Sequence, residues 1–548
     1  MNAAPAPRER WLYLGLALLL ATLWLAGLGQ RPLFNPDEGR YAEIPREMLA
    51  GGDWILPHLN GLVYAEKPPL QYWATALSYR CFGLNEFAAR LYCALCALGT
   101  IALVWVLARR LGGLQSAWRA AAMLAGMFMF AVLGHLLTLD MSLTFYLTLS
   151  LTGFLLAQPV RDQPQHARLW MLLAWAAAAF GVMTKGVVAA AIPAAVLVLY
   201  SVWTRDFSAW RRLQLRWGVP LFLLIAVPWH WLVARRDGNF LEFYFVHEHV
   251  ARYLTPVAQR VEPWWFFIGV FVAGSAPWTW SALRVLATGW RRMGSSGFDA
   301  ALFLWIWVAF IGVFFSLSDS KLMPYILPLM PAVVLLIAVS PPHTLKRDYL
   351  VTAALTLLVG LGLGAAYCRW PQLLSSSDRA AYFLPLATTA AKVAALLLVS
   401  GVFVLVQGAR DVTRAGVFLG AGWCLAWIWI GVGASAVAPV YSGLDLARSI
   451  PLDERSRPVY SVATYNQSVD FYLERSVTLV QYRGELDYGL NKDPAAEIPD
   501  LKEFEQRWSN ESQAFAVMEP SMYEKLLSDG LPMRVIGRTA VQLMAARQ

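Results

Sequence analysis

Long apolar runs recur through most of the chain, and they limit its architecture more than any other feature. A bilayer span needs about 20 mostly apolar residues. Because backbone polar groups must be satisfied inside the bilayer, we expect these runs to be helices. The sequence predicts thirteen spans, near residues 11–29, 86–108, 116–135, 139–158, 169–183, 187–203, 217–234, 264–286, 300–317, 323–340, 349–368, 384–407 and 415–437.

Composition agrees with a polytopic membrane protein. Only 15% of the 548 residues are charged, whereas soluble domains carry roughly 25%. The net charge is +9, but the basic residues lie in short loops between apolar runs, which argues against a nucleic-acid partner and leaves membrane lipids as the surroundings. Cys93 and Cys96 lie inside an apolar run without a second pair or a nearby His. We therefore expect buried thiols there rather than metal ligands.

Loop charges predict the orientation of the spans. Lys and Arg concentrate in the cytoplasmic loops of membrane proteins. Arg8 and Arg10 precede the first run, and alternate loops then carry basic groups such as Arg109 and Arg110. We therefore place the N-terminus in the cytoplasm. The long loops 30–85 and 235–263, which hold most of the loop acids, fall on the outer side.

The last part of the chain differs from the rest. An odd number of spans places residues 438–548 on the outer side, and this tail is markedly more polar. Its segments "PVYSVAT", "VTLVQY", "AFAVME" and "MRVIGR" predict strands, and "NQSVDFYLER" and "IPDLKEFEQRW" predict helices. We predict an all-α membrane bundle over residues 1–437, both outer loops included, and a small soluble α/β domain over 438–548.

The first outer loop contains "NPDEGRYAEIPREMLAGGDW". The spacing of Ile44, Met48 and Leu49 predicts an amphipathic helix lying in the membrane interface, with Glu43, Arg46 and Glu47 in water. The acids at its start, in "PDEG", allow two interpretations. They are either ordinary polar residues at the end of a helix or groups that take part in a reaction.

Two further outer-side residues allow alternative interpretations. Lys67 follows Glu66 and precedes two prolines in "AEKPP". It is either half of a surface ion pair or a fixed cation for a phosphate. Asp140 stands between two apolar runs, where ionisable residues are costly and indicate function, unless it only caps the next helix.

The strings "FNPDEGRYAEIPREMLAGGDWILP", "YAEKPPLQYW" and "SDSKLMPYILPLMP" resemble the aminoarabinose lipid A transferases. These are protein-O-mannosyltransferase-like membrane glycosyltransferases of the GT-C fold. The resemblance implies inverting transfer of 4-amino-4-deoxy-L-arabinose from undecaprenyl phosphate to lipid A phosphates, at the periplasmic face of the bacterial inner (plasma) membrane. That transfer would lower the negative charge of the envelope and protect against cationic peptides such as polymyxin.

The resemblance also implies roles for the outer-side residues. Asp37, Asp140 and Lys67 are expected to be catalytic, the carboxylates steadying the sugar and the lysine a phosphate. The expected substrate-binding residues are Arg40, Tyr41, Tyr64, Glu66, Arg252, Lys321 and Tyr325. A divalent metal is an optional cofactor, with Glu66 and His247 as ligands.

Two other functions stay open at this point. One is a GT-C glycosyltransferase that uses another polyprenyl-phosphate sugar and a protein or other glycan acceptor, in which Asp37 would act as a base. The other is a lipid or solute transporter, which predicts functional charge near the bilayer midplane. The charge here gathers at one face, which favours an enzyme.

Overall fold

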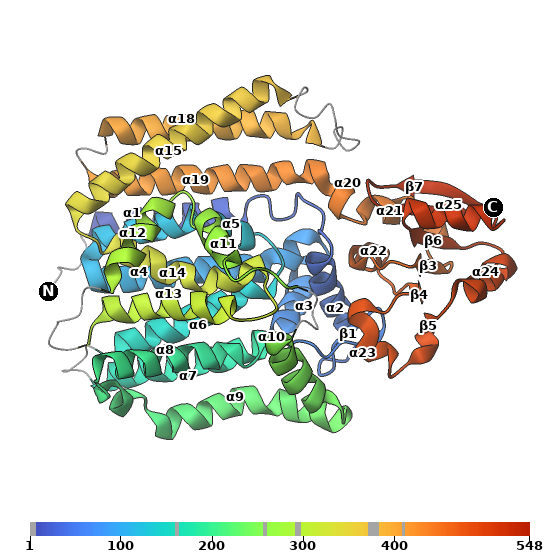
Figure 1. Cartoon of the computed structure of the whole chain (residues 1–548), viewed down its shortest axis with the longest axis horizontal. Coiled ribbons are helices and arrows are strands. Elements are labelled where there is room, and N and C mark those ends of the chain that lie inside the picture. Colours follow the sequence, from blue (N-terminus) through green and yellow to red (C-terminus); the bar gives the residue numbers. More distant parts are fainter. Residues whose placement is uncertain (1–6, 159–163, 256–259, 291–297, 371–382, 408–410) are drawn as a thin grey trace. The chain divides into compact units, whose positions relative to one another are not determined.

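The computed structural model describes residues 7–158, 164–255, 260–290, 298–370, 383–407 and 411–548 (Figure 1). These residues form two compact units. The first unit contains the described parts of Met1–Gly27, Leu91–Trp370 and Ala387–Gly431. The second contains those of Leu28–Arg90, Pro371–Leu386 and Val432–Gln548. The first outer loop thus belongs to the same unit as the C-terminal tail, while the division at residue 437 stays a prediction from composition.

The first unit is a bundle of helices. Neighbours in the bundle include α6 with α7, α7 with α8 and α9, and α13 with α14 (Figure 1). Its elements are α1 (Pro7–Leu25), α4 (Glu86–Ala125), α5 (Phe128–Leu133), α6 (Leu139–Ala157), α7 (Pro164–Lys185), α8 (Val188–Thr204), η1 (Ser208–Arg212), α9 (Leu215–Arg236), η2 (Glu242–Ala251), α10 (Arg252–Leu254), α11 (Phe266–Gly274), α12 (Thr279–Gly289), α13 (Ala300–Ser316), η4 (Met323–Leu329), α14 (Met330–Ala338), α15 (Pro342–Cys368), α18 (Leu386–Gln407) and α19 (Val412–Gly433).

Within the described residues, seven helices are long and apolar enough to cross a membrane, and four more apolar helices are shorter. The predicted span 86–108 lies within α4, and the predicted span 116–135 covers the end of α4 and all of α5. Between the two spans α4 is interrupted at Gly113, whose φ of 81° is not helical. The predicted span 264–286 is divided into α11 and α12 around Pro277, because proline lacks the N–H that a continuous helix needs. The polytopic helical architecture is confirmed, whereas the number thirteen stays a prediction.

Many large apolar side chains point out of this unit. Leu224 on α9 is 72% exposed, and Leu358 on α15 and Val406 on α18 are each 64% exposed. Apolar surface of this extent is unfavourable in water and neutral against lipid tails. These helices are therefore suited to contact lipid.

Small residues bring helices of the bundle close together. A Cβ added to Gly420 on α19 would lie 2.3 Å from the carbonyl oxygen of Ala122 on α4, so the two backbones touch. Cys93 and Cys96 are buried, as expected, and the Cys93 thiol donates to the Thr138 carbonyl oxygen at 3.3 Å. Backbone contact of this kind is typical of helix packing in membranes.

The second unit is built around a six-stranded sheet in the order β5-β4-β3-β6-β8-β7. The strands β5 (Glu497–Ile498), β4 (Thr478–Val480), β3 (Val459–Val462) and β6 (Phe515–Met518) are parallel, whereas β8 (Leu543–Arg547) is antiparallel to β6 and β7 (Met533–Arg538). The four predicted strands and both predicted helices are confirmed. The sequence missed β5, which has two residues, and β8, whose "LMAAR" has weak strand propensity. We call residues 459–548 the sheet region.

The helices of the sheet region are α22 (Gln467–Leu473), α23 (Asp487–Leu490), α24 (Leu501–Asn510) and α25 (Pro520–Ser528). Residues of α24 and α25 pack into one apolar core with the strands. Phe504 and Trp508 of α24 are fully buried against Val462, Ala516 and Leu543 of the strands. Burial of this area supplies most of the driving force for folding the region.

The first outer loop folds as α2 (Asp37–Gly51), the hairpin β1–β2 (His58–Leu59 and Leu62–Val63) and α3 (Leu70–Phe82). The prediction that Glu43 faces water is wrong. Its side chain is fully buried and accepts two hydrogen bonds from Arg46, at 2.6 and 2.7 Å. The reason is that α2 packs against α22, so protein rather than solvent covers this polar face of the helix.

Candidate functional site

The two acids at the start of α2 have opposite environments. The Asp37 side chain is 52% exposed, and its carboxylate lies 3.4 Å from Nη1 of Arg40. Glu38 is buried, and both of its oxygens accept hydrogen bonds from Arg31 and Arg90. Burial alone would raise the pKa of Glu38, but the charges of Arg90 and Arg31 outweigh it and lower that pKa well below its ordinary value. Glu38 is therefore a structural anion, and Asp37 is the acid presented outward.

Arg40 is the centre of a buried aromatic cluster. Its guanidinium pairs with Glu485 of the sheet region and lies 5.8 Å from the ring centroid of Tyr41, which stacks on Tyr72. Among the described residues, the hydroxyls of Tyr64 and Tyr72 and the Nε of Arg40 are buried without a hydrogen-bond partner. Native proteins rarely leave such atoms unsatisfied, so this cluster has the chemistry to receive a polar ligand.

Lys67 lies beside its neighbour in the chain. Its ammonium donates to the backbone carbonyl of Glu66 at 3.0 Å and lies 3.8 Å from the Glu66 carboxylate. Both side chains are largely buried, at 13% and 17% exposed. Both alternatives for Lys67 stay open, because an ion pair with Glu66 does not exclude a contact with phosphate.

In the first unit, Asp140 pairs with a lysine. It lies in the first turn of α6, where the N-cap residue is Thr138, and its carboxylate accepts a hydrogen bond from Lys185, the last residue of α7. The Lys185 ammonium also lies 4.9 Å from the ring centroid of Tyr325 in η4. The carboxylate and the aromatic face together hold the Lys185 ammonium in place.

Other predicted residues of the first unit lie in separate contacts. Arg252 donates to the Glu248 carboxylate at 2.6 Å, and His247 Nδ1 lies 3.5 Å from the same carboxylate. Lys321 is buried and donates to the Ser318 carbonyl at 2.6 Å. Residues 256–259 of the predicted loop 235–263 are outside the described residues. Asp140 and Tyr325 are thus linked through Lys185, whereas Lys321 contacts the neighbouring turn at Ser318.

The structure does not supply a metal site from the predicted ligands. No group of three or more His, Cys, Asp or Glu side chains suited to a metal ion occurs within the described ranges. Glu66 faces the Lys67 ammonium and His247 faces Glu248. Divalent ions need several convergent ligands, and a metal ion held by Glu66 and His247 stays a prediction.

The sequence did not single out several residues that organise these clusters. Arg90 is a lone cation at the start of an apolar run, and that position was a usable signal. No such signal in the sequence marks Arg31, Tyr72 or Glu485, because their partners either lie far away in the sequence or belong to common residue types. Lys185 follows an apolar run in "MTKG", a position that by itself is typical of an anchor at the membrane interface.

Comparisons with known proteins point to the same class of membrane glycosyltransferase that the sequence resembles. The family model described as "Aminoarabinose transferase C-terminal domain" matches residues 451–547, and that described as "Dolichyl-phosphate-mannose-protein mannosyltransferase" matches residues 10–244. The proteins named undecaprenyl phosphate-alpha-4-amino-4-deoxy-L-arabinose arabinosyl transferase include one from Aeromonas salmonicida, 33% identical over 63% of this chain and 63% of that protein. One from Pseudomonas aeruginosa is 34% identical over 65% of this chain and 64% of that protein. The chain therefore spans slightly less than two thirds of the length of these curated relatives.

The structural similarity covers almost the whole chain. A crystal structure of ArnT from Cupriavidus metallidurans bound to undecaprenyl phosphate has a TM-score of 0.89 and 32% sequence identity. The match covers 99% of this chain and 98% of that one. The same protein in the apo state has a TM-score of 0.88.

Proposed function

We propose a glycosyl transfer, on the premise that this chain belongs to the aminoarabinose transferase family of membrane glycosyltransferases. The donor is 4-amino-4-deoxy-L-arabinose linked to undecaprenyl phosphate, and the acceptors are the phosphate groups of lipid A. The observation that carries the proposal is the similarity, along almost the entire chain, to a protein crystallised with undecaprenyl phosphate.

The reaction is a single displacement. A lipid A phosphate oxygen attacks the anomeric carbon as the bond from that carbon to the donor phosphate oxygen breaks, and the bonding electrons leave with undecaprenyl phosphate. The configuration at the anomeric carbon inverts. Because the nucleophile is already anionic near pH 7, it needs little help from a base. The main obstacle is repulsion between two phosphates, which nearby cations reduce.

Cations and acids of the two units suit this reaction. We assign Lys67, Arg40 and Arg252 to the phosphates, and the carboxylates of Asp37 and Asp140 to the sugar. Asp37 is supported by its exposure beside Arg40. Each charge-assisted hydrogen bond to a phosphate contributes about 1.5–3 kcal/mol. Side chains therefore supply charge stabilisation in this proposal.

The buried hydroxyls of the second unit extend the assignment. Tyr64 and Tyr72 lie near Arg40 with hydroxyls that have no partner within the described part of the chain. We assign Tyr64 and Tyr41 to substrate binding around Arg40, with Glu66 beside them, and Tyr325 and Lys321 to the outer mouth of the bundle. Donated hydrogen bonds from these hydroxyls would satisfy atoms that are costly to bury alone.

The orientation is part of the proposal. We place the N-terminus in the cytoplasm and the C-terminal region in the periplasm of a multi-pass inner-membrane protein. A reporter fused after residue 548 should give the signal of a periplasmic fusion. A cytoplasmic signal from a full-length, inserted fusion would contradict the orientation.

The substrate assignment can be tested in cells. A strain without its own aminoarabinose transferase is complemented with the wild-type gene or with Asp37→Asn, and its lipid A is analysed by mass spectrometry. We expect the aminoarabinose adduct with the wild type and its loss with the variant at equal membrane levels. Absence of the adduct with inserted wild-type protein would overturn the substrate assignment and favour another polyprenyl-phosphate sugar.

A further inference from the structure

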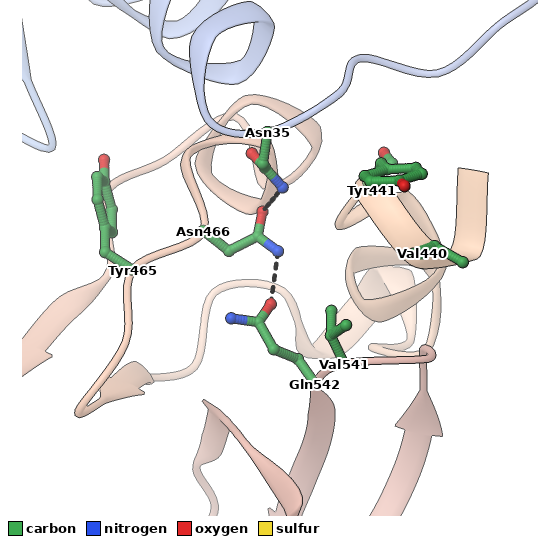
Figure 2. A pocket seen from close by; sticks show the side chains of 8 residues that line it. Asn35, Val440, Tyr441, Tyr465, Asn466, Val541 and Gln542 are labelled. Carbon is green, nitrogen blue, oxygen red and sulfur yellow. Dashed lines mark hydrogen bonds between the residues drawn. The ribbon is translucent and has the colours of Figure 1, made fainter. Parts of the chain in front are cut away.

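Asn35, two residues before Asp37, is tied to the sheet region by several hydrogen bonds, of which Figure 2 shows the one to Asn466. Its Nδ2 donates to Asn466 Oδ1 at 2.5 Å and to Ser468 Oγ at 3.0 Å, and its Oδ1 accepts from the Ser468 backbone N–H at 2.9 Å. Its own backbone N–H donates to the carbonyl of Tyr441 at 2.8 Å. The segment that enters α2 is therefore fixed at Asn35 by four hydrogen bonds to residues more than 400 positions away.

The contact continues as a row of side-chain amides. Asn466 Nδ2 donates to Gln542 Oε1 at 2.7 Å, and Gln542 Nε2 donates to Thr464 Oγ1 at 2.9 Å. Asn466 and Gln542 are each only 8% exposed. Because each amide in this row both donates and accepts, the orientation of one sets that of the next. We call Asn35, Asn466 and Gln542 the amide row.

The row lines a cavity of about 150 Å³ whose other walls are mostly apolar (Figure 2). Apolar side chains of Val440 and Val541 and the rings of Tyr441 and Tyr465 surround the amides. An apolar surrounding strengthens hydrogen bonds and makes an unpaired amide costly. The row is therefore a defined connection and not an exchangeable surface contact.

Close backbone packing occurs at the same place. A Cβ added to Gly39 would lie 2.6 Å from the Ser468 backbone nitrogen and 2.7 Å from Asn35 Oδ1. The first turn of α2 thus lies directly on the start of α22. Asp37 is within that turn, and its half-exposed carboxylate lies 3.4 Å from the Arg40 guanidinium. Its location is consequently set by the backbone that the amide row holds.

We propose that the amide row positions Asp37, so that the sheet region is part of the machinery that sets the geometry of transfer. Asn466 and Gln542 are positioning residues that act through Asn35 and the backbone of residues 35–39. The inference rests on the proposed function for its catalytic consequence, but the mechanical connection stands without it. Because reactive groups must be placed closely, a displacement of about 1 Å can cost on the order of 100-fold in rate.

The connection is tested by hydrogen exchange on the full-length protein in lipid nanodiscs. Asn466→Ala removes the central amide, and Asn510→Ala, at an exposed position on α24, is the matched control. We expect backbone amides of residues 34–41 to exchange about tenfold faster in Asn466→Ala, the effect of losing roughly one net hydrogen bond, while β6 and the control are unchanged. Unchanged exchange at 34–41 would overturn the proposal.

Gln542→Ala serves as a second variant, because it removes the outer end of the row and leaves the Asn35–Asn466 contact in place. It covers the case in which Asn466→Ala does not fold. We expect a smaller acceleration of exchange, confined to the same segment. Acceleration spread over the whole sheet region would indicate general destabilisation and would also overturn a positioning role.

Kinetics of the same variants separate positioning from binding. We expect Asn466→Ala to lower kcat at least about tenfold with the KM for the donor unchanged within about twofold. Asn466→Asp should recover much of the rate, because a carboxylate accepts from Asn35 and the Gln542 amide can turn to donate. In an Asp37→Glu background, Asn466→Ala should lower kcat by less than about twofold, since its effect passes through Asp37.

A rise in KM at constant kcat would contradict action through Asp37. So would a complete loss of activity on introducing Asn466→Ala into both the wild-type and the Asp37→Glu backgrounds. If the wild type transfers no aminoarabinose, the proposed function fails. The exchange experiment still decides whether the amide row holds the start of α2.

Discussion

Arg90 binds the carboxylate of Glu38 with two hydrogen bonds, from Nε to Oε1 at 2.7 Å and from Nη2 to Oε2 at 3.0 Å. Arg31 binds the same carboxylate at 2.7 and 3.0 Å. The preceding residue, Asp37, is half exposed. The two adjacent acids therefore have different roles. Glu38 fixes the chain through its arginine partners, whereas Asp37 faces outward.

Arg90→Ala should destabilise the protein strongly, because it removes one of two partners of a buried carboxylate. We expect a loss of about 3–5 kcal/mol in the free energy of unfolding, measured by denaturant titration in detergent. Arg414, whose side chain is 81% exposed in a pair with Asp411, is the control, and Arg414→Ala should cost under about 1 kcal/mol. Equal effects of the two substitutions would contradict a structural role for the Arg90–Glu38 pair.

Asp37→Asn should abolish most transfer without unfolding the protein. Its exposed carboxylate makes little contribution to packing, whereas loss of a charge facing the reacting sugar typically costs about 100- to 1000-fold in kcat. Transfer to lipid A by purified protein measures the rate, and thermal unfolding measures the fold. Asp453→Asn, at an exposed site of the same unit, should leave both unchanged. Retention of more than about a tenth of the activity in Asp37→Asn would exclude a central role.

Lys67→Ala should weaken donor binding. If its ammonium contacts the donor phosphate, KM for the donor rises by about 10- to 100-fold, the loss of one charge-assisted hydrogen bond. Lys67→Arg should recover part of this affinity by keeping the charge. The exposed Lys525 supplies the control Lys525→Ala. Donor titrations at two salt concentrations measure the effect, and an unchanged KM would assign Lys67 to the ion pair with Glu66 alone.

Glu47 makes stability depend on pH. Burial, followed by the charge of Glu43, raises its pKa from 4.5 to about 8. The folded protein therefore holds a proton that the unfolded chain releases above pH 4.5. The associated stability is fully present below pH 4.5 and is lost as pH rises through about 8.

Glu47→Gln, which resembles the protonated form, should flatten this decline. Denaturation midpoints of both proteins between pH 4.5 and 9 measure it, with the exposed Glu519→Gln as control. The variant should match the wild type near pH 4.5 and exceed it at pH 8. Parallel curves would show that Glu47 does not titrate in this range.

Asp140 and Lys185 should act as one unit. Their ion pair joins the first turn of α6 to the end of α7. We expect Asp140→Asn and Lys185→Met each to lower transfer at least about tenfold, and the double variant to be no worse than the poorer single one, which corresponds to a coupling of about 1–3 kcal/mol. Transfer rates of the wild type, the two single variants and the double variant complete this double-mutant cycle. Losses of rate that multiply in the double variant would show that the two residues contribute independently.

The helical bundle, the C-terminal α/β region and several of the charged residues in the clusters could be predicted from the sequence. The periodicity and length of apolar runs are local properties that the sequence displays directly. The pattern of "NPDEGRYAEI" likewise identified a helix with acids at its start. It failed on Glu43, because a helix pattern shows which face is polar but not what covers that face.

What the sequence determined by itself was therefore the class of protein, the helical spans as elements and the residue types available at the outer loops. The tertiary structure decided which of those residues meet. Arg90 reaches Glu38 across 52 positions and Asn35 reaches Asn466 across 431. Such pairings depend on loop closure and on the packing of α2 against α22, which no local pattern encodes. The distinct roles of Asp37 and Glu38 follow from that packing, since only one of the two neighbours is covered by arginines.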